Sequence, residues 1–195
     1  MKQITGIICF IMLISSAVKT EGSYVIEAFY ANDTIIDAKN QNGGGVSLLY
    51  CINDRLKAIL RGTYTSYYDT RVHNALEYDV TYSHMVLLAG IGYEPPIDLL
   101  ERYRLTWRNS ILLGYSKTEV KADAVKEYSS SDSGIAIAVN TGLGYNLTQN
   151  VQFFAEAGLH NSFYYGDLED AKIYGVQFLA GVCYSLSGTR SLGDY

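Results

Sequence analysis

The stretch VQFFAEAGLHNSFYYG, residues Val151–Gly166, alternates with a period of two residues. The odd-numbered positions are mainly apolar and carry aromatic side chains near both ends, at Phe153 and Phe163. The even-numbered positions are mostly small or polar and include Glu156 and His160. Because successive side chains of a β-strand point to opposite faces, this pattern predicts a strand with one apolar and one polar face.

The same alternation recurs along the chain and predicts eight strands. They are Ser23–Asn32, Gly44–Ile52, Arg55–Asp69, Leu76–Tyr93, Arg104–Lys117, Ser133–Leu147, Val151–Gly166 and Ile173–Leu186. The second and third strands are joined by a tight polar turn at Asn53-Asp54, and the sixth and seventh by Thr148-Gln149-Asn150. Pro95-Pro96 and one short turn, Ile97–Tyr103, join the fourth and fifth.

The other connections are polar and mostly longer. We expect loops at Asp33–Gly43, Thr70–Ala75, Thr118–Asp132 and Asp167–Lys172. Short turns at one end and longer loops at the other are typical of an outer-membrane barrel with both termini in the periplasm. The predicted fold is therefore all-β, an eight-stranded antiparallel up-and-down transmembrane β-barrel.

Composition limits the function classes. Of the 195 residues 18% are charged, 18 are tyrosine and 18 are glycine, and the formal net charge is -5. So few charges argue against a disordered chain, and an acidic balance argues against a nucleic-acid partner. Tyrosine and glycine with only two prolines favour a sheet protein.

The first residues resemble a secretory leader. Lys2 supplies a positive start, an apolar run spans Ile4–Ile14, and Ser15-Ser16-Ala17 offers small residues for cleavage. The run is too short for a transmembrane helix, which needs about 20 apolar residues. We therefore expect a signal peptide at residues 1–17, the barrel at residues 18–186, and a short periplasmic tail at residues 187–195.

Three of the predicted strands end alike, with Gly90-Ile91-Gly92-Tyr93, Gly142-Leu143-Gly144-Tyr145 and Gly181-Val182-Cys183-Tyr184. Inward glycine suits a crowded lumen, and outward tyrosine suits a membrane-interface girdle. With these ends and the phrase GLGYNLTQNVQFFAEAG (Gly142–Gly158), the chain resembles the small outer-membrane barrels of diderm bacteria, the OmpX, OmpA-transmembrane, OmpW and opacity-protein group. The resemblance covers nearly the whole mature chain and implies a cell outer membrane location. Unlike many members of that group, the chain continues past its last strand.

Outward aromatic residues fall at two heights along the predicted strands. Tyr174 and Tyr184 are ten residues apart on one face, which at about 3.4 Å per residue and a tilt near 40° separates them by about 26 Å in height. That spacing matches the ~25 Å apolar band of such barrels. The expected lower girdle is Tyr93, Trp107, Tyr145, Phe153 and Tyr184. The expected upper girdle is Tyr64, Tyr68, Tyr78, Phe163, Tyr165 and Tyr174.

Charged residues on the inward faces are expected to meet in the lumen. The predicted network is Glu27, Arg61, Arg108, Glu156 and His160. In a ring of eight, Arg61 lies opposite Glu156, and Arg108 lies opposite Glu27. An eight-stranded interior is just wide enough for side chains to fill, so the network is interpreted as a structural plug, with a gate as the alternative.

The strand Leu76–Tyr93 presents a conflict of phase. Tyr78, Val80 and Tyr82 have the opposite parity to Ala89, Ile91 and Tyr93, although both sets are suited to the lipid face. Either a bulge lies between Tyr82 and Leu87, or one set faces inward.

No metal site or cofactor is expected, because His73 and His84 stand apart from other ligand residues. Cys51 and Cys183 are expected to face the lumen as free thiols, because one strand lies between their strands.

Four functions compete. The main expectation is a non-enzymatic, monomeric barrel with its longer loops at the cell surface, as an antigen, an adhesin or a structural protein. Its partners would be outer-membrane lipids, the outer-membrane assembly machinery and host molecules. The alternatives are a narrow porin-like channel, a lipid A deacylase that uses His160-x-Ser162 with Glu169 downstream, and a soluble lipocalin-like barrel.

Overall fold

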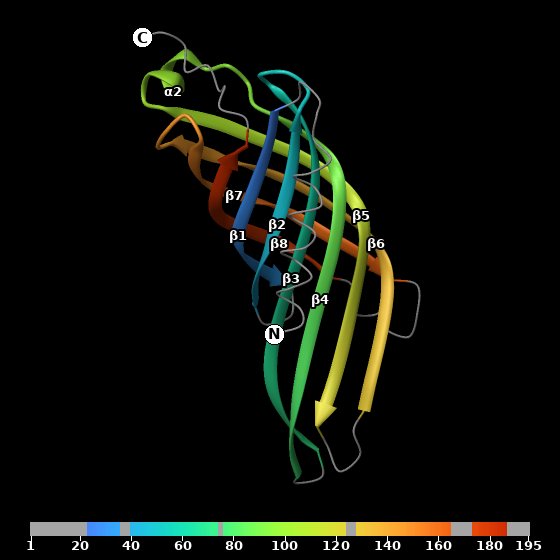
Figure 1. Ribbon diagram of the computed structural model, residues 1–195. Helices are drawn as coiled ribbons and strands as arrows, with labels where there is room; N and C mark the ends of the chain where they lie inside the picture. The colour runs from blue at the N-terminus through green and yellow to red at the C-terminus, as the bar shows by residue number, and fades with distance from the viewer. Residues whose placement is uncertain (1–22, 36–39, 74–75, 124–127, 165–172, 187–195) are drawn as a thin grey trace.

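The computed structural model describes residues 23–35, 40–73, 76–123, 128–164 and 173–186 (Figure 1). The predicted leader, the tail after residue 186 and the loop Asp167–Lys172 lie outside these residues. The strands are β1 (Ser23–Ile35), β2 (Gln41–Cys51), β3 (Leu56–His73), β4 (Leu76–Tyr93), β5 (Leu105–Asp123), β6 (Tyr128–Asn146), β7 (Val151–Tyr164) and β8 (Ile173–Ser185). A five-residue helix, α2 (Asp98–Arg102), lies between β4 and β5.

The eight strands form one closed barrel in chain order, and β1 pairs with both β2 and β8. All the pairings are antiparallel, so the predicted fold class, an up-and-down β-barrel, is confirmed. Each described strand is therefore paired on both sides over part or all of its length.

Side chains of the turn residues explain the two tight connections. Asn53 Oδ1 accepts the backbone N–H groups of Arg55 at 2.9 Å and Leu56 at 2.8 Å. Thr148 Oγ1 accepts those of Asn150 at 3.2 Å and Val151 at 3.0 Å. Such local bonds are the reason that Asn and Thr favour turns, and they hold the predicted turns between β2 and β3 and between β6 and β7.

The barrel wall separates an apolar outer face from a mixed interior. Exposed outward side chains include Leu87, Ile111, Leu159 and Phe178. The buried interior combines apolar residues such as Leu112 with ionised and polar ones. This arrangement is the reverse of a soluble barrel, which would place its apolar face inward, and it argues against the lipocalin-like alternative.

Several strands run further than their sequence pattern suggests. β3 and β4 pair as far as His73 and Leu76, and β5 and β6 as far as Ala122 and Tyr128. Most of the predicted loops Thr70–Ala75 and Thr118–Asp132 is therefore strand. Sequence patterning fails there because a strand that continues past the apolar band keeps its backbone hydrogen bonds but no longer needs apolar side chains.

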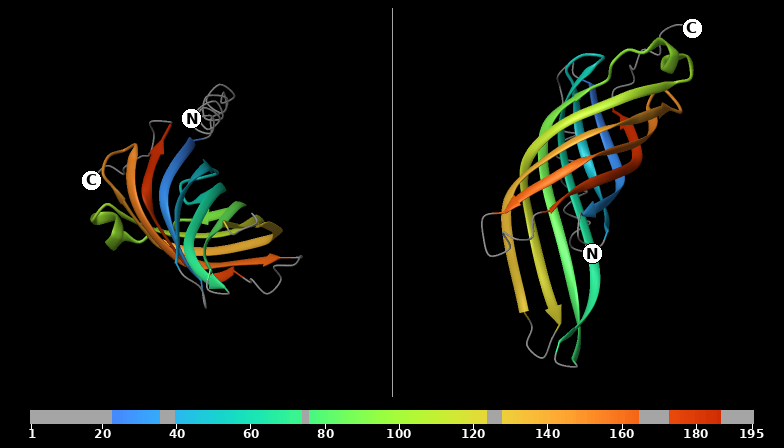
Figure 2. Two further views of the ribbon diagram at one scale, coloured as in Figure 1. Left: turned by 90° about the horizontal axis from the view of Figure 1, so that it is seen from below. Right: turned by 180° about the vertical axis from the view of Figure 1, so that it is seen from behind.

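The long strands project beyond the rest of the barrel. β2 pairs with β3 only as far as Ser66, and β7 pairs with β6 only as far as Gly134. Beyond these points β3 to β6 form a four-stranded extension at the end opposite α2 (Figure 2). The extension holds a stacked pair, Tyr67 and Tyr82, with ring centroids 4.6 Å apart.

The phase of β4 is settled without a bulge. Its register with β3 is continuous from Leu76 to Tyr93, and Val80, His84, Val86 and Leu88 are all buried. The second interpretation of the phase conflict is correct, because the even-numbered set that includes Tyr82 faces inward. The ring of Tyr82 stacks on that of Tyr67.

Within the described residues, no helix is long and apolar enough to cross a membrane.

Candidate functional site

Four ionised side chains meet inside the barrel. Glu27, Arg61, Arg108 and Glu156 come from β1, β3, β5 and β7, so every second strand contributes one. Each stands at an inward position of its strand, and none is more than 6% exposed. We call these four residues the charge quartet.

Each arginine of the quartet contacts both carboxylates. Arg61 Nη2 lies 3.4 Å from Glu27 Oε2 and 3.3 Å from Glu156 Oε2. Arg108 Nε lies 2.9 Å from Glu156 Oε1, and Arg108 Nη2 forms an ion pair with Glu27. The opposed pairs expected from the sequence are present together with both cross-pairs, and the four formal charges sum to zero.

Neutral groups also contact the quartet. Arg61 Nε donates to Ser47 Oγ at 3.1 Å, and Arg108 Nη1 donates to Gln152 Oε1 at 2.9 Å. The Arg108 guanidinium also lies 4.4 Å from the centroid of the Phe154 ring. Buried charges are tolerated when paired and hydrogen-bonded in this way.

Gly144 makes room for one of these partners. A Cβ added at Gly144 would lie 2.5 Å from Cδ of Gln152, closer than side chains approach one another. The repeated glycine at the end of β6 therefore lets Gln152 occupy the position from which it accepts the Arg108 bond.

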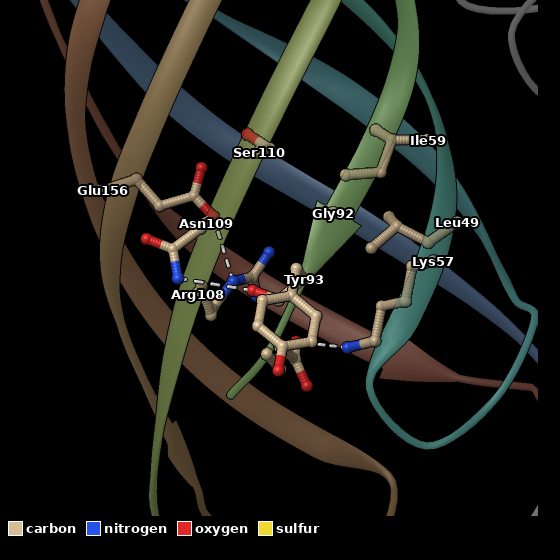
Figure 3. Close-up of a pocket in the computed structure, with 10 residues that line it drawn as sticks. Leu49, Lys57, Ile59, Gly92, Tyr93, Arg108, Asn109, Ser110 and Glu156 are labelled. Atoms are coloured by element: carbon tan, nitrogen blue, oxygen red, sulfur yellow. Dashed lines mark hydrogen bonds and ion pairs between the residues drawn. The ribbon is translucent and has the colours of Figure 1, made fainter. Parts of the chain in front are cut away.

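A small cavity lies beside the quartet. Its volume is about 10 Å³, which is room for roughly one water molecule. Figure 3 shows Glu156 and Arg108 across this cavity from Leu49 and Lys57. Lys57 forms an ion pair with Glu94 at the same end of the lumen.

His160 belongs to a different place in the lumen. It stands four residues beyond Glu156 on β7, about 13 Å along the strand, and its hydrogen-bond partner is Ser162, not a quartet member. His160 therefore does not join the charge network as expected. The alternation of one strand shows which face a side chain is on, but not which side chains it meets across the lumen.

Asp33, His84, His160 and Ser162 form a second group, which we call the histidine cluster. They come from β1, β4 and β7, and none is more than 3% exposed. Ser162 Oγ lies 3.4 Å from His84 Nε2 and 3.3 Å from His160 Nε2, and the two imidazole rings stack with centroids 5.3 Å apart.

The expectation that His84 stands apart is therefore wrong. Two features of the sequence concealed the cluster. The alternation of β4 allows two phases, so it does not assign His84 to the lumen, and Asp33 lies in a predicted loop although it is an inward residue near the end of β1. Extending the alternation of β1 by one residue would have brought Asp33 inside.

The His160-x-Ser162 pair is inside the barrel wall. Both side chains are buried in the lumen, so they do not face the outer surface where a lipid substrate would lie. Glu169 lies outside the described residues. Nucleophilic catalysis also needs a group that orients the base, and among the described residues Nδ1 of His160 has no hydrogen-bond partner.

The aromatic residues of the expected lower girdle all face outward. Tyr93, Trp107, Tyr145, Phe153 and Tyr184 are each between 43% and 51% exposed. Tyr145 and Phe153 are direct cross-strand partners, which places them at one height.

The expected upper girdle is only partly on the outer face. Tyr64, Tyr68 and Phe163 face outward. The prediction for Tyr78 is wrong. This residue is at an even-numbered, inward position of β4, because the strand has no bulge that would reverse its phase. Tyr174 is in β8, opposite Asn161, and Tyr165 lies outside the described residues.

Solved structures with the same fold are outer-membrane barrels. The attachment invasion locus protein Ail of Yersinia pestis, solved with the heparin analogue sucrose octasulfate, is 20% identical over 86% of this chain and 100% of Ail, with a TM-score of 0.58. Neisserial surface protein A is 17% identical over 85% and 97%, with a TM-score of 0.54. A major outer membrane protein from Thermus thermophilus is 10% identical over 86% and 100%, with a TM-score of 0.62.

No family model matches the sequence, and no curated protein is significantly similar to it. The similarity to solved structures nevertheless shows that the chain shares the fold of the small eight-stranded outer-membrane barrels, as the sequence resemblance predicts.

Proposed function

We propose that this chain is a non-enzymatic, monomeric integral protein of the cell outer membrane that acts at the cell surface through the extension of β3 to β6. The observation that carries the proposal is the apolar outer face. On four different strands, large apolar side chains are at least 50% exposed: Leu87, Ile111, Leu159 and Phe178. Exposure of such an apolar face to water would be costly in free energy, whereas contact with lipid chains would not.

The two ends of the barrel support one orientation. The start of β1, the end of β8, α2 and both tight turns lie at one end. The extension of β3 to β6 lies at the other (Figure 2). Short connections face the periplasm in bacterial barrels and the longer elements face outward, so the extension would be extracellular and both termini periplasmic.

The charge quartet supports a closed lumen in preference to a channel. The four side chains pair across the lumen, and the cavity beside them has room for roughly one water molecule. A passage for solutes would require the quartet to open, at the cost of separating buried charges.

The extension is the surface available for contacts with host molecules. Ail was solved with a heparin analogue, and host contact by this chain is proposed by analogy with that shared fold. The lipids of the outer membrane and its assembly machinery would be the other partners.

Epitope insertion tests the orientation. A tag placed between Asp123 and Tyr128 should be labelled by antibody on intact cells. The matched control is the same tag between Asn53 and Asp54, which should be labelled only after the outer membrane is permeabilised. The opposite labelling would overturn the orientation, and a protein that fractionates without membranes would overturn the membrane location.

A further inference from the structure

The histidine cluster has the donor set of a metal site. Asp33, His84 and His160 each offer one ligand atom, and these three atoms all lie within 4.8 Å of one another. Two imidazoles and one carboxylate are ligands that zinc-class divalent ions bind, commonly as three protein ligands with one further position open. The three residues approach from β1, β4 and β7, three sides of the lumen.

The charge of Asp33 is not balanced by the residues around it. Its carboxylate accepts hydrogen bonds from Gln177 Nε2 at 2.8 Å and from Thr65 Oγ1 at 3.2 Å, and both donors are neutral. In the described part of the chain no lysine or arginine pairs with it, whereas Glu27 and Glu156 each contact two arginines. Buried carboxylates are normally paired with a cation or coordinate a metal.

The imidazoles have unused nitrogens. Each ring approaches Ser162 through Nε2, and Nδ1 of both His84 and His160 is buried with no hydrogen-bond partner among the described residues. A buried polar atom left without a partner is costly, and a native structure usually supplies one. A metal ion would be a partner for such a nitrogen.

We propose that Asp33, His84 and His160 bind one divalent transition-metal ion of the zinc class inside the lumen. Ser162 stands beside both rings and would orient them, while Thr65 and Gln177 would orient the carboxylate, as groups around metal ligands commonly do. The bound ion would offset the negative charge of Asp33 and link strands on three sides of the barrel.

The distances require a modest adjustment of the side chains. Zinc–nitrogen bonds of about 2.0–2.1 Å place two ligand atoms of a tetrahedral site roughly 3.4 Å apart. Ligand atoms at 4.8 Å would close by about 1.4 Å, which rotation of the imidazoles and the carboxylate about their χ angles can supply.

The test uses the folded protein in detergent micelles, purified without a polyhistidine tag. Co²⁺, added as a spectroscopic substitute for Zn²⁺, should give the visible d–d absorption of a low-symmetry site with one ion per chain. Zn²⁺ should displace it, and a chelator should abolish it. Wild-type protein that binds no ion under these conditions would overturn the proposal.

Variants locate the site. Asp33→Asn, His84→Gln and His160→Gln should each weaken binding by more than about 100-fold, and Thr65→Val, which removes only an orienting hydroxyl, by about 10- to 100-fold. His73→Gln, which changes the third histidine of the chain, is the matched control and should bind as wild type does. Each variant is first shown to fold by its heat-modifiable gel shift.

Binding that survives the His84→Gln/His160→Gln double substitution, or that is lost in His73→Gln, would overturn the assignment. If a variant of the cluster fails to fold, the Co²⁺ spectrum of the wild type and the affinity of Thr65→Val still test the proposed site. Neither outcome bears on the outer-membrane function, because the tag-labelling experiment does not depend on metal.

Discussion

Arg108 and Glu156 meet inside the barrel, with Arg108 Nε 2.9 Å from Glu156 Oε1, although their strands are not neighbours. β6 lies between β5 and β7, so the contact is made through the lumen and not along the wall. Because the same guanidinium also pairs with Glu27, the quartet is one network and not two separate salt bridges. Its members should therefore be energetically coupled.

Glu156→Gln should destabilise the barrel by about 3–5 kcal/mol, because it leaves two buried arginine charges with Glu27 as their one remaining carboxylate in the quartet. Arg61→Gln should cost a similar amount, and the double substitution should cost less than the sum, with a coupling of roughly 0.5–3 kcal/mol. Reversible urea unfolding in lipid vesicles measures these free energies. The control pair is Glu119 and Lys121, exposed and 3.1 Å apart, whose single neutral variants should each change stability by about 1 kcal/mol or less. Additive effects within the quartet would contradict the network.

Removal of an opposite pair from the quartet should open the lumen. The wild-type barrel should show little ion conductance in a planar bilayer, because an eight-stranded interior is just wide enough for side chains to fill and the quartet pairs across it. Arg61→Ser with Glu156→Ser preserves the net charge, removes two long side chains and should produce discrete conductance steps. Glu119→Ser with Lys121→Ser, on the outward face of β5, should not. Equal conductance of the wild type and the quartet variant would refute the plug.

A charge placed on the apolar outer face should be costly. Leu159 is 67% exposed on β7, and Leu159→Arg should destabilise the folded barrel in vesicles by about 2–4 kcal/mol if the residue lies near the bilayer midplane. Val176→Arg on the neighbouring β8, paired with Leu159, should behave alike. Glu119→Arg, on the extension, is the comparison and should change stability little. Tolerance of all three substitutions would contradict the proposed membrane face.

Cys51 and Cys183 should remain reduced in the mature protein. Both are free in the structure, and they lie on opposite sides of β1, paired with Ser23 and Glu27. The four-residue offset along β1 alone separates them by about 13 Å, beyond the ~7 Å that a disulfide spans between Cα atoms. Labelling of the denatured, unreduced protein should modify both thiols. Labelling that appears only after reduction would show that the two strands are closer than this register allows.

The alternation in the sequence determined which face of most strands is apolar, how many strands there are and where the tight turns fall. β7 is an example, because the odd positions that include Leu159 and Phe163 are the outward ones. These features are local, since the period of a strand and the hydrogen bonding of a turn residue depend on only a few neighbouring residues. The polar ends of the long strands were missed because their pairing partners, not their side chains, keep them extended.

Only the tertiary structure decided which inward side chains meet. Glu156 and His160 share one face of β7, yet one joins the charge quartet and the other joins Asp33 and His84. The physical reason is the stagger between neighbouring strands, which accumulates around a closed barrel and sets the height at which each inward residue reaches the lumen. The alternation of a single strand carries no information about that stagger, so it gave the inward residues of β7 but could not assign them to two separate groups.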